Sequence, residues 1–160
     1  VQGSKSFPSL LPRPYEVDAA DLGKSAAPEP APSSEQQAPL SYEKRGSLNA
    51  AVQKFESSNA AFRAALPEVR RVVSAAAGSG RSSEPWIYAQ VMLSRLEIVR
   101  APSVEALATI DQLLIEQLAE ESQGSAGGSG VAAIREARAP IALAVEEQSE
   151  IIADLAGRIG

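Results

Sequence analysis

Apolar side chains recur at helical spacing through most of the chain after its first 46 residues. Over 47–77, steps of 4 and 3 residues place one set of side chains on a single side of a helix. This set is Leu48, Val52, Phe55, Asn59, Phe62, Leu66, Val69, Val73 and Ala76. Ser47 has the side chain of a helix N-cap, and "GSGRSS" ends the pattern. We therefore expect a long helix over 47–77, kinked at Pro67 because proline cannot donate a backbone hydrogen bond.

Two shorter helices are expected next, over 84–100 and 103–122. Ser82 or Ser83 would cap the first of them, and two adjacent rows of this helix are apolar, which indicates deep burial. The rows are Trp86, Ala89, Leu93 and Leu96, and beside them Ile87, Val91 and Ile98. Pro102 disfavours a helical conformation of the residue before it, so the helix is expected to end there. Ser103 would cap the next helix, whose apolar positions are Val104, Leu107, Ile110, Leu114 and Leu118.

The last helix is expected over 131–159, with a kink at Pro140. Its positions again alternate by 4 and 3 residues: Ile134, Arg138, Ile141, Val145, Gln148, Ile152, Leu155 and Ile159. Arg138 and Gln148 interrupt this apolar row. Polar residues there can fix helix register or mark a contact with another chain. For Arg138 the kink favours a surface position, in which the aliphatic part of the side chain packs and the charge reaches water.

These elements predict an all-α protein, with an up-and-down four-helix bundle whose outer helices are kinked. A bent three-helix arrangement is the alternative, and the pattern leaves open whether the middle helices form a hairpin or a broken rod. Residues 47–83 carry five basic and two acidic side chains, whereas residues 84–122 carry two basic and seven acidic ones. This charge difference favours packing of the first helix beside the middle pair.

Residues 1–46 differ in composition from the rest of the chain, because they hold seven of the 11 prolines. This density of proline rules out helix and disfavours strand pairing. The stretch "SAAPEPAPSSEQQAP" is typical of an extended spacer. The sequence therefore predicts two parts, an extended tail over 1–46 and a helical bundle over 47–160.

The tail opens with "SFPSLLPRPYE", in which large apolar side chains alternate with prolines. Proline pre-extends such a peptide and lowers the entropy lost when it docks on another protein. We expect residues 7–16 to bind a partner. Phe7, Leu10, Leu11 and Tyr15 would be the apolar anchors, and Arg13 would supply one charge-assisted contact.

Composition argues against most catalytic chemistry. The 160 residues contain no Cys and no His, which removes thiolate and imidazole metal ligands and the commonest general base. Glu120, Glu121, Glu146, Glu147 and Glu150 are interpreted as solvated helix faces, because di-metal bundles need Glu and His together. We expect no enzymatic activity, no cofactor and no metal. "GSAGGSG" lacks the features of a phosphate loop and is interpreted as a spacer.

The net charge of −5 makes nucleic acid an improbable partner, since most affinity for a phosphate backbone comes from Lys and Arg. No run of about 18 apolar residues is present, so no transmembrane segment is expected. The chain begins at Val1 and not at Met, which suggests a removed leader or a trimmed chain.

The stretches "PSLLPRPYE" and "WIYAQVMLSRLEIVRAPSVEALATID" resemble peptides of uncharacterised helical envelope proteins of alphaproteobacteria. The resemblance implies a periplasmic or outer-membrane-associated protein. It brings no catalytic motif, and no lipid-bearing Cys is visible for an anchor.

Together these features favour an accessory or scaffold protein of the cell envelope that binds a larger, membrane-associated complex. A second hypothesis is a carrier or sensor of an apolar small molecule, with a pocket near the kinks at Pro67 and Pro140. A third is self-association through the rows of 4 and 3 spacing.

Overall fold

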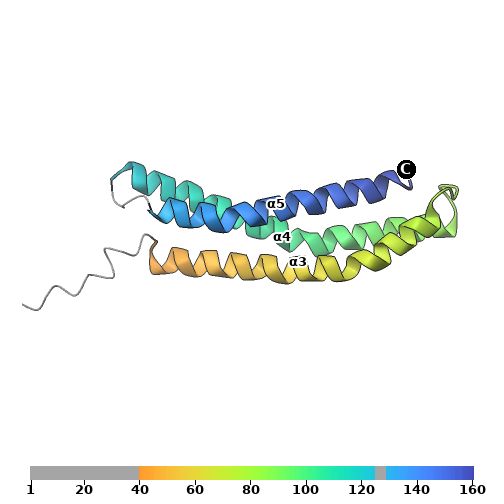
Figure 1. The fold of residues 1–160 in the computed structure, drawn as a ribbon, viewed down its shortest axis with the longest axis horizontal. Coiled ribbons are helices and arrows are strands. Elements are labelled where there is room, and N and C mark those ends of the chain that lie inside the picture. Colours follow the sequence, from red (N-terminus) through yellow and green to blue (C-terminus); the bar gives the residue numbers. More distant parts are fainter. Residues whose placement is uncertain (1–39, 125–128) are drawn as a thin grey trace, which may run out of the picture. The chain divides into compact units, whose positions relative to one another are not determined.

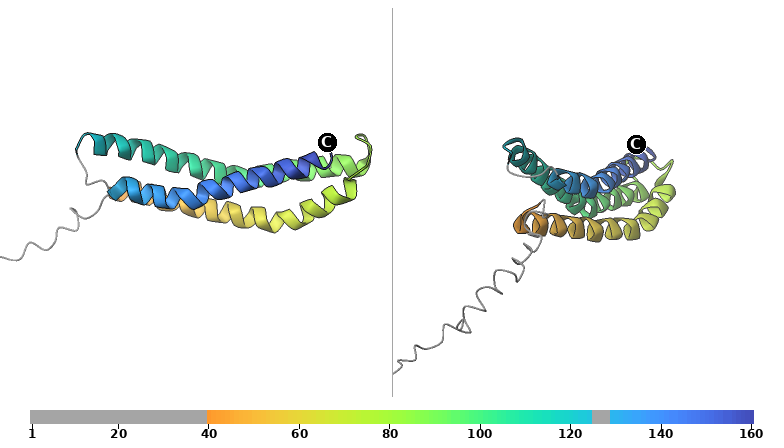
Figure 2. Two further views of the ribbon diagram at one scale, coloured as in Figure 1. Left: turned by 45° about the horizontal axis from the view of Figure 1, so that its top comes forward. Right: turned by 60° about the vertical axis from the view of Figure 1, so that its left-hand side comes forward.

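The structure is a computed structural model that describes residues 40–124 and 129–160. The described residues form three α-helices and no strand: α3 (Tyr42–Ala76), α4 (Glu84–Ser122) and α5 (Ser129–Gly157). The predicted all-α fold class is confirmed for this part of the chain. The helices run side by side, and α4 packs along both neighbours while α3 and α5 touch each other little (Figures 1 and 2).

The helix α3 begins at Tyr42, before the expected start at Ser47. Ser41 caps it, because the Ser41 hydroxyl oxygen accepts a hydrogen bond of 3.2 Å from the Lys44 amide. Leu40 is buried just outside the helix. The helix continues through Pro67, as predicted, and ends before Gly78, whose φ of 79° suits a residue without a side chain.

The prediction of four helices is wrong, because α4 continues through Pro102 and replaces the two short middle helices. Pro102 lacks the amide that would bond the Ile98 carbonyl, at a cost of about 3 kcal/mol. Packing on both sides of the proline offsets this cost, since Leu96 and Ile110 are almost completely buried. The arrangement is thus the three-helix alternative, and Ser103 is a buried residue within a helix and not a cap.

The helix α5 begins at Ser129, close to the expected residue 131. A carboxylate oxygen of Glu121 accepts a hydrogen bond of 3.1 Å from the Val131 amide, which satisfies one free donor of the first helical turn. The predicted row of this helix is confirmed. All of its members are buried except Arg138, which is half-buried.

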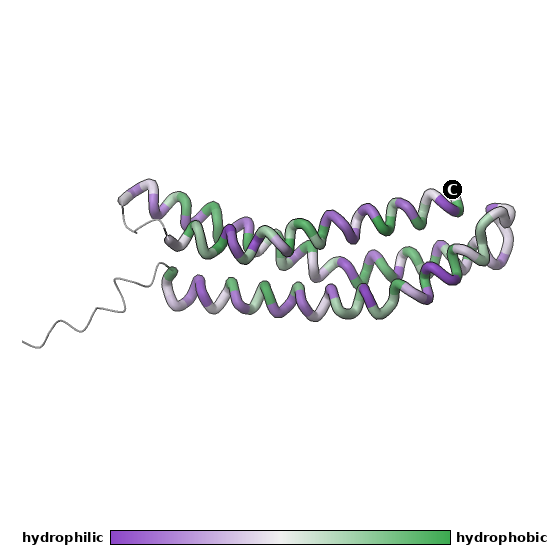
Figure 3. Tube along the Cα trace, in the orientation of Figure 1, coloured by the Kyte–Doolittle hydropathy of each residue, from purple (hydrophilic) through white to green (hydrophobic). Residues whose placement is uncertain are grey.

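The core consists of two apolar clusters along the length of the unit. The first cluster joins the end of α3, the start of α4 and the end of α5: Phe62, Leu66, Val69, Val72, Val73, Ala76, Ala89, Leu93, Leu96, Ile152, Leu155 and Ile159. The second joins their other halves: Leu40, Leu48, Ala51, Phe55, Ala106, Ile110, Leu113, Ile134, Ile141 and Val145. Apolar and polar residues accordingly alternate along every helix (Figure 3).

Trp86 packs against the first cluster, which agrees with its expected place in the core. Its indole nitrogen also donates a hydrogen bond of 2.8 Å to the Ile159 carbonyl. This bond ties the start of α4 to the end of the chain.

Candidate functional site

The predicted docking peptide lies outside the described residues. Phe7, Leu10, Leu11, Arg13 and Tyr15 all precede residue 40, where the description begins. Their binding role stays a prediction.

The side of α4 that faces away from the core is unexpectedly apolar. We call it the outer face of α4 and define it by the exposed large side chains Ile87, Tyr88, Val91, Ile98, Val104, Ile115 and Leu118. Deep burial was predicted for three of these, and that prediction is wrong: the side chain of Ile98, for example, is 71% exposed. The reason is that α3 and α5 both pack on the opposite side of α4, so no described element covers this one.

A groove between α4 and α5 continues the outer face. Its volume is about 670 Å³, and its apolar lining is formed by Ala101, Val104, Ile152, Ala153 and Ala156. Alanine side chains let another backbone approach closely. Two carboxylates, those of Glu97 and Glu105, and the guanidinium group of Arg100 also line the groove. Glu105 forms an ion pair with Lys54 of α3.

Polar residues separate the two apolar clusters, and we call Ser58, Asn59, Arg100, Ser103 and Gln148 the central polar layer. The Ser103 hydroxyl donates to the Ser58 hydroxyl oxygen at 2.8 Å, and the Ser58 hydroxyl donates to the Val99 carbonyl at 2.8 Å. These bonds join α3 to α4 beside Pro102. They satisfy hydroxyl groups that would otherwise be costly to bury.

The same layer joins the remaining helix pairs. The Gln148 amide nitrogen donates a hydrogen bond of 3.0 Å to the Asn59 side-chain oxygen, from α5 to α3. A guanidinium nitrogen of Arg100 donates a bond of 3.3 Å to the Val145 carbonyl, from α4 to α5. Two buried atoms of the layer, Gln148 Oε1 and Arg100 Nε, have no hydrogen-bond partner among the described residues.

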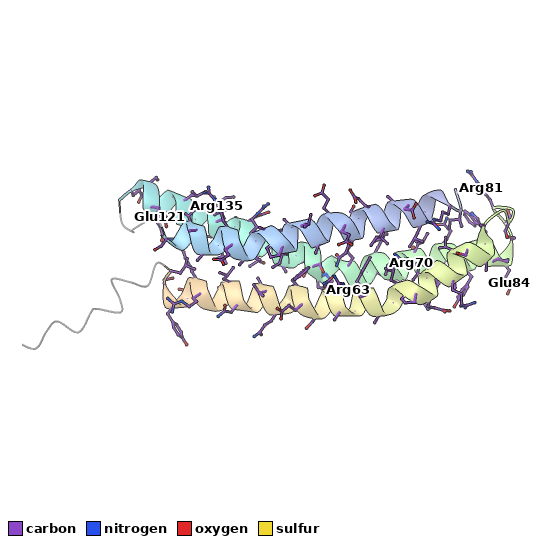
Figure 4. The ribbon with its side chains drawn as sticks, in the orientation of Figure 1. Arg63, Arg70, Arg81, Glu84, Glu121 and Arg135 are labelled. Carbon is purple, nitrogen blue, oxygen red and sulfur yellow. The ribbon has the colours of Figure 1, made fainter. Side chains whose placement is uncertain are left out.

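A pocket between α3 and α5 opens onto the central polar layer. We call it the α3–α5 pocket; its volume is about 150 Å³ and its lining residues are Asn59, Phe62, Arg63, Leu66, Arg70, Ala144, Glu147, Gln148 and Ile151. It lies beside Pro67 and one helical turn from Pro140 in sequence, where a pocket was expected. Its lining is mixed and not simply apolar. Arg63 and Arg70 both come from α3 (Figure 4).

Among the described residues, the groups whose pKa is shifted belong to ion pairs near the surface and do not line this pocket. The hydrogen bond from Arg71 lowers the pKa of Glu68, and the Glu68 carboxylate in turn raises the pKa of Arg71. Arg138 donates to Asp111 on α4, and this bond raises the pKa of Arg138. Arg138 is therefore half-exposed and paired across helices.

The five glutamates interpreted as solvated helix faces are mostly exposed, and two of them also make contacts with other helices. Glu146, Glu147 and Glu150 are exposed. Glu120 pairs with Lys44 on α3, and Glu121 holds the first turn of α5.

Within residues 40–124 and 129–160, no group of acidic side chains is arranged to hold a metal ion. No helix in these ranges combines the length and hydropathy needed to cross a bilayer.

The sequence showed part of the central polar layer in advance. Gln148 was singled out as a polar member of the last row, and it contacts Asn59, which was predicted only as a member of the first row. Ser58 and Ser103 were missed, because Ser58 lies beside the α3 row and Ser103 follows a proline and so resembled a cap.

The comparisons with known proteins found no matching family model, no matching curated protein and no matching solved structure.

Proposed function

We propose that the helical unit is a non-enzymatic accessory or scaffold module that binds a partner protein through the outer face of α4. The observation that carries this proposal is the row of exposed apolar side chains on a helix whose other side is fully packed. Groups of large apolar side chains that stay exposed on one side of a helix are typical of interaction sites. Ile87, Val91 and Ile98 share one side of the helix, at steps of 4 and 7 residues.

The fitting occupant is an amphipathic helix of the partner, with basic residues beside its apolar side. Such helices bind in apolar grooves through anchors one or two turns apart. The groove between α4 and α5 supplies an apolar floor, and Glu97, which lines it, has no ion-pair partner among the described residues. Residues 84–122 carry seven acidic and two basic side chains, and three of the acidic ones pair with basic residues of α3 or α5. The remaining excess of acidic side chains on α4 is complemented by basic flanks on the partner.

The proposal keeps the predicted docking peptide over 7–16 as a second point of contact. We also propose that the protein binds the larger complex in the cell envelope, either in the periplasm or at the outer membrane. The sequence resemblance supports this location, and the proline-rich composition of the tail supports the docking role.

The test replaces two outer-face residues by lysine in the full chain, as Val91→Lys with Ile98→Lys. Leu143→Lys is the matched control, because Leu143 is an exposed apolar residue of α5 that does not line the groove. We expect proteins that crosslink to the intact chain in envelope extracts to be lost with the double variant and kept with the control. Equal recovery with both variants would contradict the proposal.

Ultracentrifugation of the same variants tests whether a second copy covers the outer face of α4. This arrangement differs from the predicted self-association through the rows of 4 and 3 spacing, because most members of those rows are buried inside the helical unit. A mass that rises with concentration in the intact chain, and not in the double variant, would identify a second copy as the occupant.

A second candidate function is the carriage or sensing of a small molecule. The observation that favours it is the α3–α5 pocket, which lies beside Pro67 of α3 and one helical turn from Pro140 of α5. A thermal unfolding temperature that rises with added ligand is the first measurement for this function, because a ligand that binds the folded state stabilises it.

A further inference from the structure

Gln148, which lines the α3–α5 pocket, has a buried side-chain acceptor that lacks a donor within the described ranges. Gln148 is 3% exposed and lines the pocket. Its amide nitrogen is engaged by Asn59, whereas its oxygen Oε1 has no partner among the described residues. A buried acceptor without a donor destabilises the folded protein, so a ligand that donates a hydrogen bond to it gains free energy on binding.

Opposite charges stand on the two sides of the same pocket. Arg63 comes from α3 and Glu147 from α5, and both side chains are exposed. Neither side chain has an ion-pair partner in the part of the chain that the structure describes. Arg70, two turns beyond Arg63, adds a second positive charge at one end of the pocket.

The remaining lining is apolar. Phe62, Leu66, Ala144 and Ile151 come from both helices. The volume of about 150 Å³ is several times the roughly 30 Å³ that one water molecule takes up in the liquid. The pocket therefore has room for several water molecules, which a small organic ligand could displace.

We propose that the α3–α5 pocket binds a small zwitterion, an α-amino acid with an apolar side chain. Its carboxylate would pair with Arg63, and its ammonium group would face Glu147 and donate to Gln148 Oε1 after a rotation of the Gln148 side chain that turns this buried atom towards the pocket. Its side chain would lie against Leu66 and Ile151. This inference rests on the second candidate function and names its ligand class; it does not depend on protein binding by the outer face of α4.

The choice of a zwitterion follows from the lining. A fatty acid would satisfy Arg63 and the apolar floor but would leave Gln148 Oε1 without a donor and bring a second negative charge to Glu147. An amine would satisfy Gln148 and Glu147 but leave Arg63 without an anion. Only a ligand with both groups close together meets the two charges and the buried acceptor.

The test is a titration of the full chain with L-leucine, followed in amide NMR spectra that resolve the side-chain amides of Asn59 and Gln148. We expect saturable shifts at these two amides and along the adjoining turns of α3 and α5. Isocaproic acid, which is leucine without its ammonium group, and isoamylamine, which lacks the carboxylate, should each bind at least about tenfold more weakly.

Arg63→Gln tests the charge, with Arg135→Gln as the matched control. Both residues are exposed helical arginines, and Arg135 lies on α5 outside this pocket, towards the end where α4 leads into α5 (Figure 4). Arg63→Gln should weaken leucine binding by about tenfold, whereas Arg135→Gln should leave it unchanged. Circular dichroism confirms that both variants keep their helices.

The outcomes of the titration distinguish the zwitterion inference from the carrier function. Equal binding of leucine and isocaproic acid at the pocket would overturn the zwitterion inference and leave the carrier function standing. Shifts that stay linear up to the solubility limit of leucine, or that Arg135→Gln reduces as much as Arg63→Gln does, would overturn the inference. Absence of saturable binding for all three compounds would overturn the inference, whereas a rise in unfolding temperature with an apolar ligand would still support the carrier function.

Discussion

The buried hydroxyls of Ser58 and Ser103 show how single residues allow α4 to continue through a proline. Pro102 takes one hydrogen bond away from the helix, and the two hydroxyls add two bonds between α3 and α4 at the same level. Hydroxyl groups are costly to bury without a partner, so each depends on the other. The pair therefore fixes α3 against the middle of α4.

Ser58→Ala should lower the free energy of unfolding by about 1–2 kcal/mol, because Ser103 loses its acceptor and the Val99 carbonyl loses a donor. Chemical denaturation followed by circular dichroism measures this difference. Ser57→Ala is the control, since Ser57 is the exposed neighbour on the same helix. Equal losses for the two variants would mean that helix propensity, and not the buried bonds, sets the effect.

The exposed ion pair of Glu68 and Arg71 is expected to make a pH-dependent contribution to the stability of the fold. The hydrogen bond from Arg71 lowers the pKa of Glu68 in the folded protein. A lowered carboxyl pKa stabilises the fold above the ordinary pKa, and this stabilisation is lost as the pH falls through the lowered value. Because both side chains are exposed, the effect on stability is small.

Arg71→Gln should raise the pKa of Glu68 towards its ordinary value, as measured by NMR titration of the carboxyl carbon. The small difference in unfolding temperature between the two proteins should be present at neutral pH and vanish in acid. A Glu68 pKa that is the same in both proteins would contradict the assigned hydrogen bond.

At the scale of the helices, α4 has two apolar sides and only one of them is packed. Leu96 and Ile98 are two residues apart and were both expected in the core, yet they are 1% and 71% exposed. The apolar pattern gives the width of a face but not the number of helices that cover it. Only two helices are described beside α4, and both pack on the side of Leu96.

Alanine substitutions at these two positions should therefore differ sharply. Leu96→Ala should lower the free energy of unfolding by about 2–5 kcal/mol, because it leaves a cavity in the first cluster. Ile98→Ala should change it by less than about 0.5 kcal/mol, as expected of a surface position. Similar losses in urea denaturation would show that the outer face of α4 is covered in the intact protein.

The rows of α3 and α5 could be predicted residue by residue, because spacings of 4 and 3 extend over many turns of each helix. The path of α4 could not. Pro102 and Ser103 together have the local signature of a helix end and a new cap, and only tertiary packing overrides it. That error also shifted the predicted row beyond Pro102, where Val104 and Leu118 are exposed and Ala106 and Leu113 are buried.

The candidate sites, too, could be predicted from the sequence only in part. A pocket near Pro67 and Pro140 was expected from the freed carbonyls of two kinked helices, and the α3–α5 pocket lies there. Its charged lining was not foreseen, because Arg63 and Glu147 lie far apart in sequence and outside the apolar rows. Spacing along one helix does not give the register of two helices against each other.

At the scale of the helical unit, long-range polar contacts tie the ends of the helices together. Lys44 lies in the first turn of α3. Its ammonium group donates a hydrogen bond of 3.2 Å to the Gln117 side chain and forms an ion pair with Glu120, and these contacts join the start of α3 to the end of α4. At the opposite end of α4, Trp86 donates to Ile159. Residues 40–46 thus belong to the helical unit by their contacts, although their sequence was assigned to the tail.

Two truncations test this boundary. A chain that starts at Pro39 keeps Leu40, the Ser41 cap and Lys44, and should unfold at the same denaturant concentration as the full chain. A chain that starts at Ser47 loses the burial of Leu40, worth about 1.5–3 kcal/mol, and the cap, worth about 1 kcal/mol. We expect its urea midpoint to fall accordingly. If instead both chains match the full one, the first turn of α3 does not contribute to stability, and the helical unit is independent of everything before Ser47.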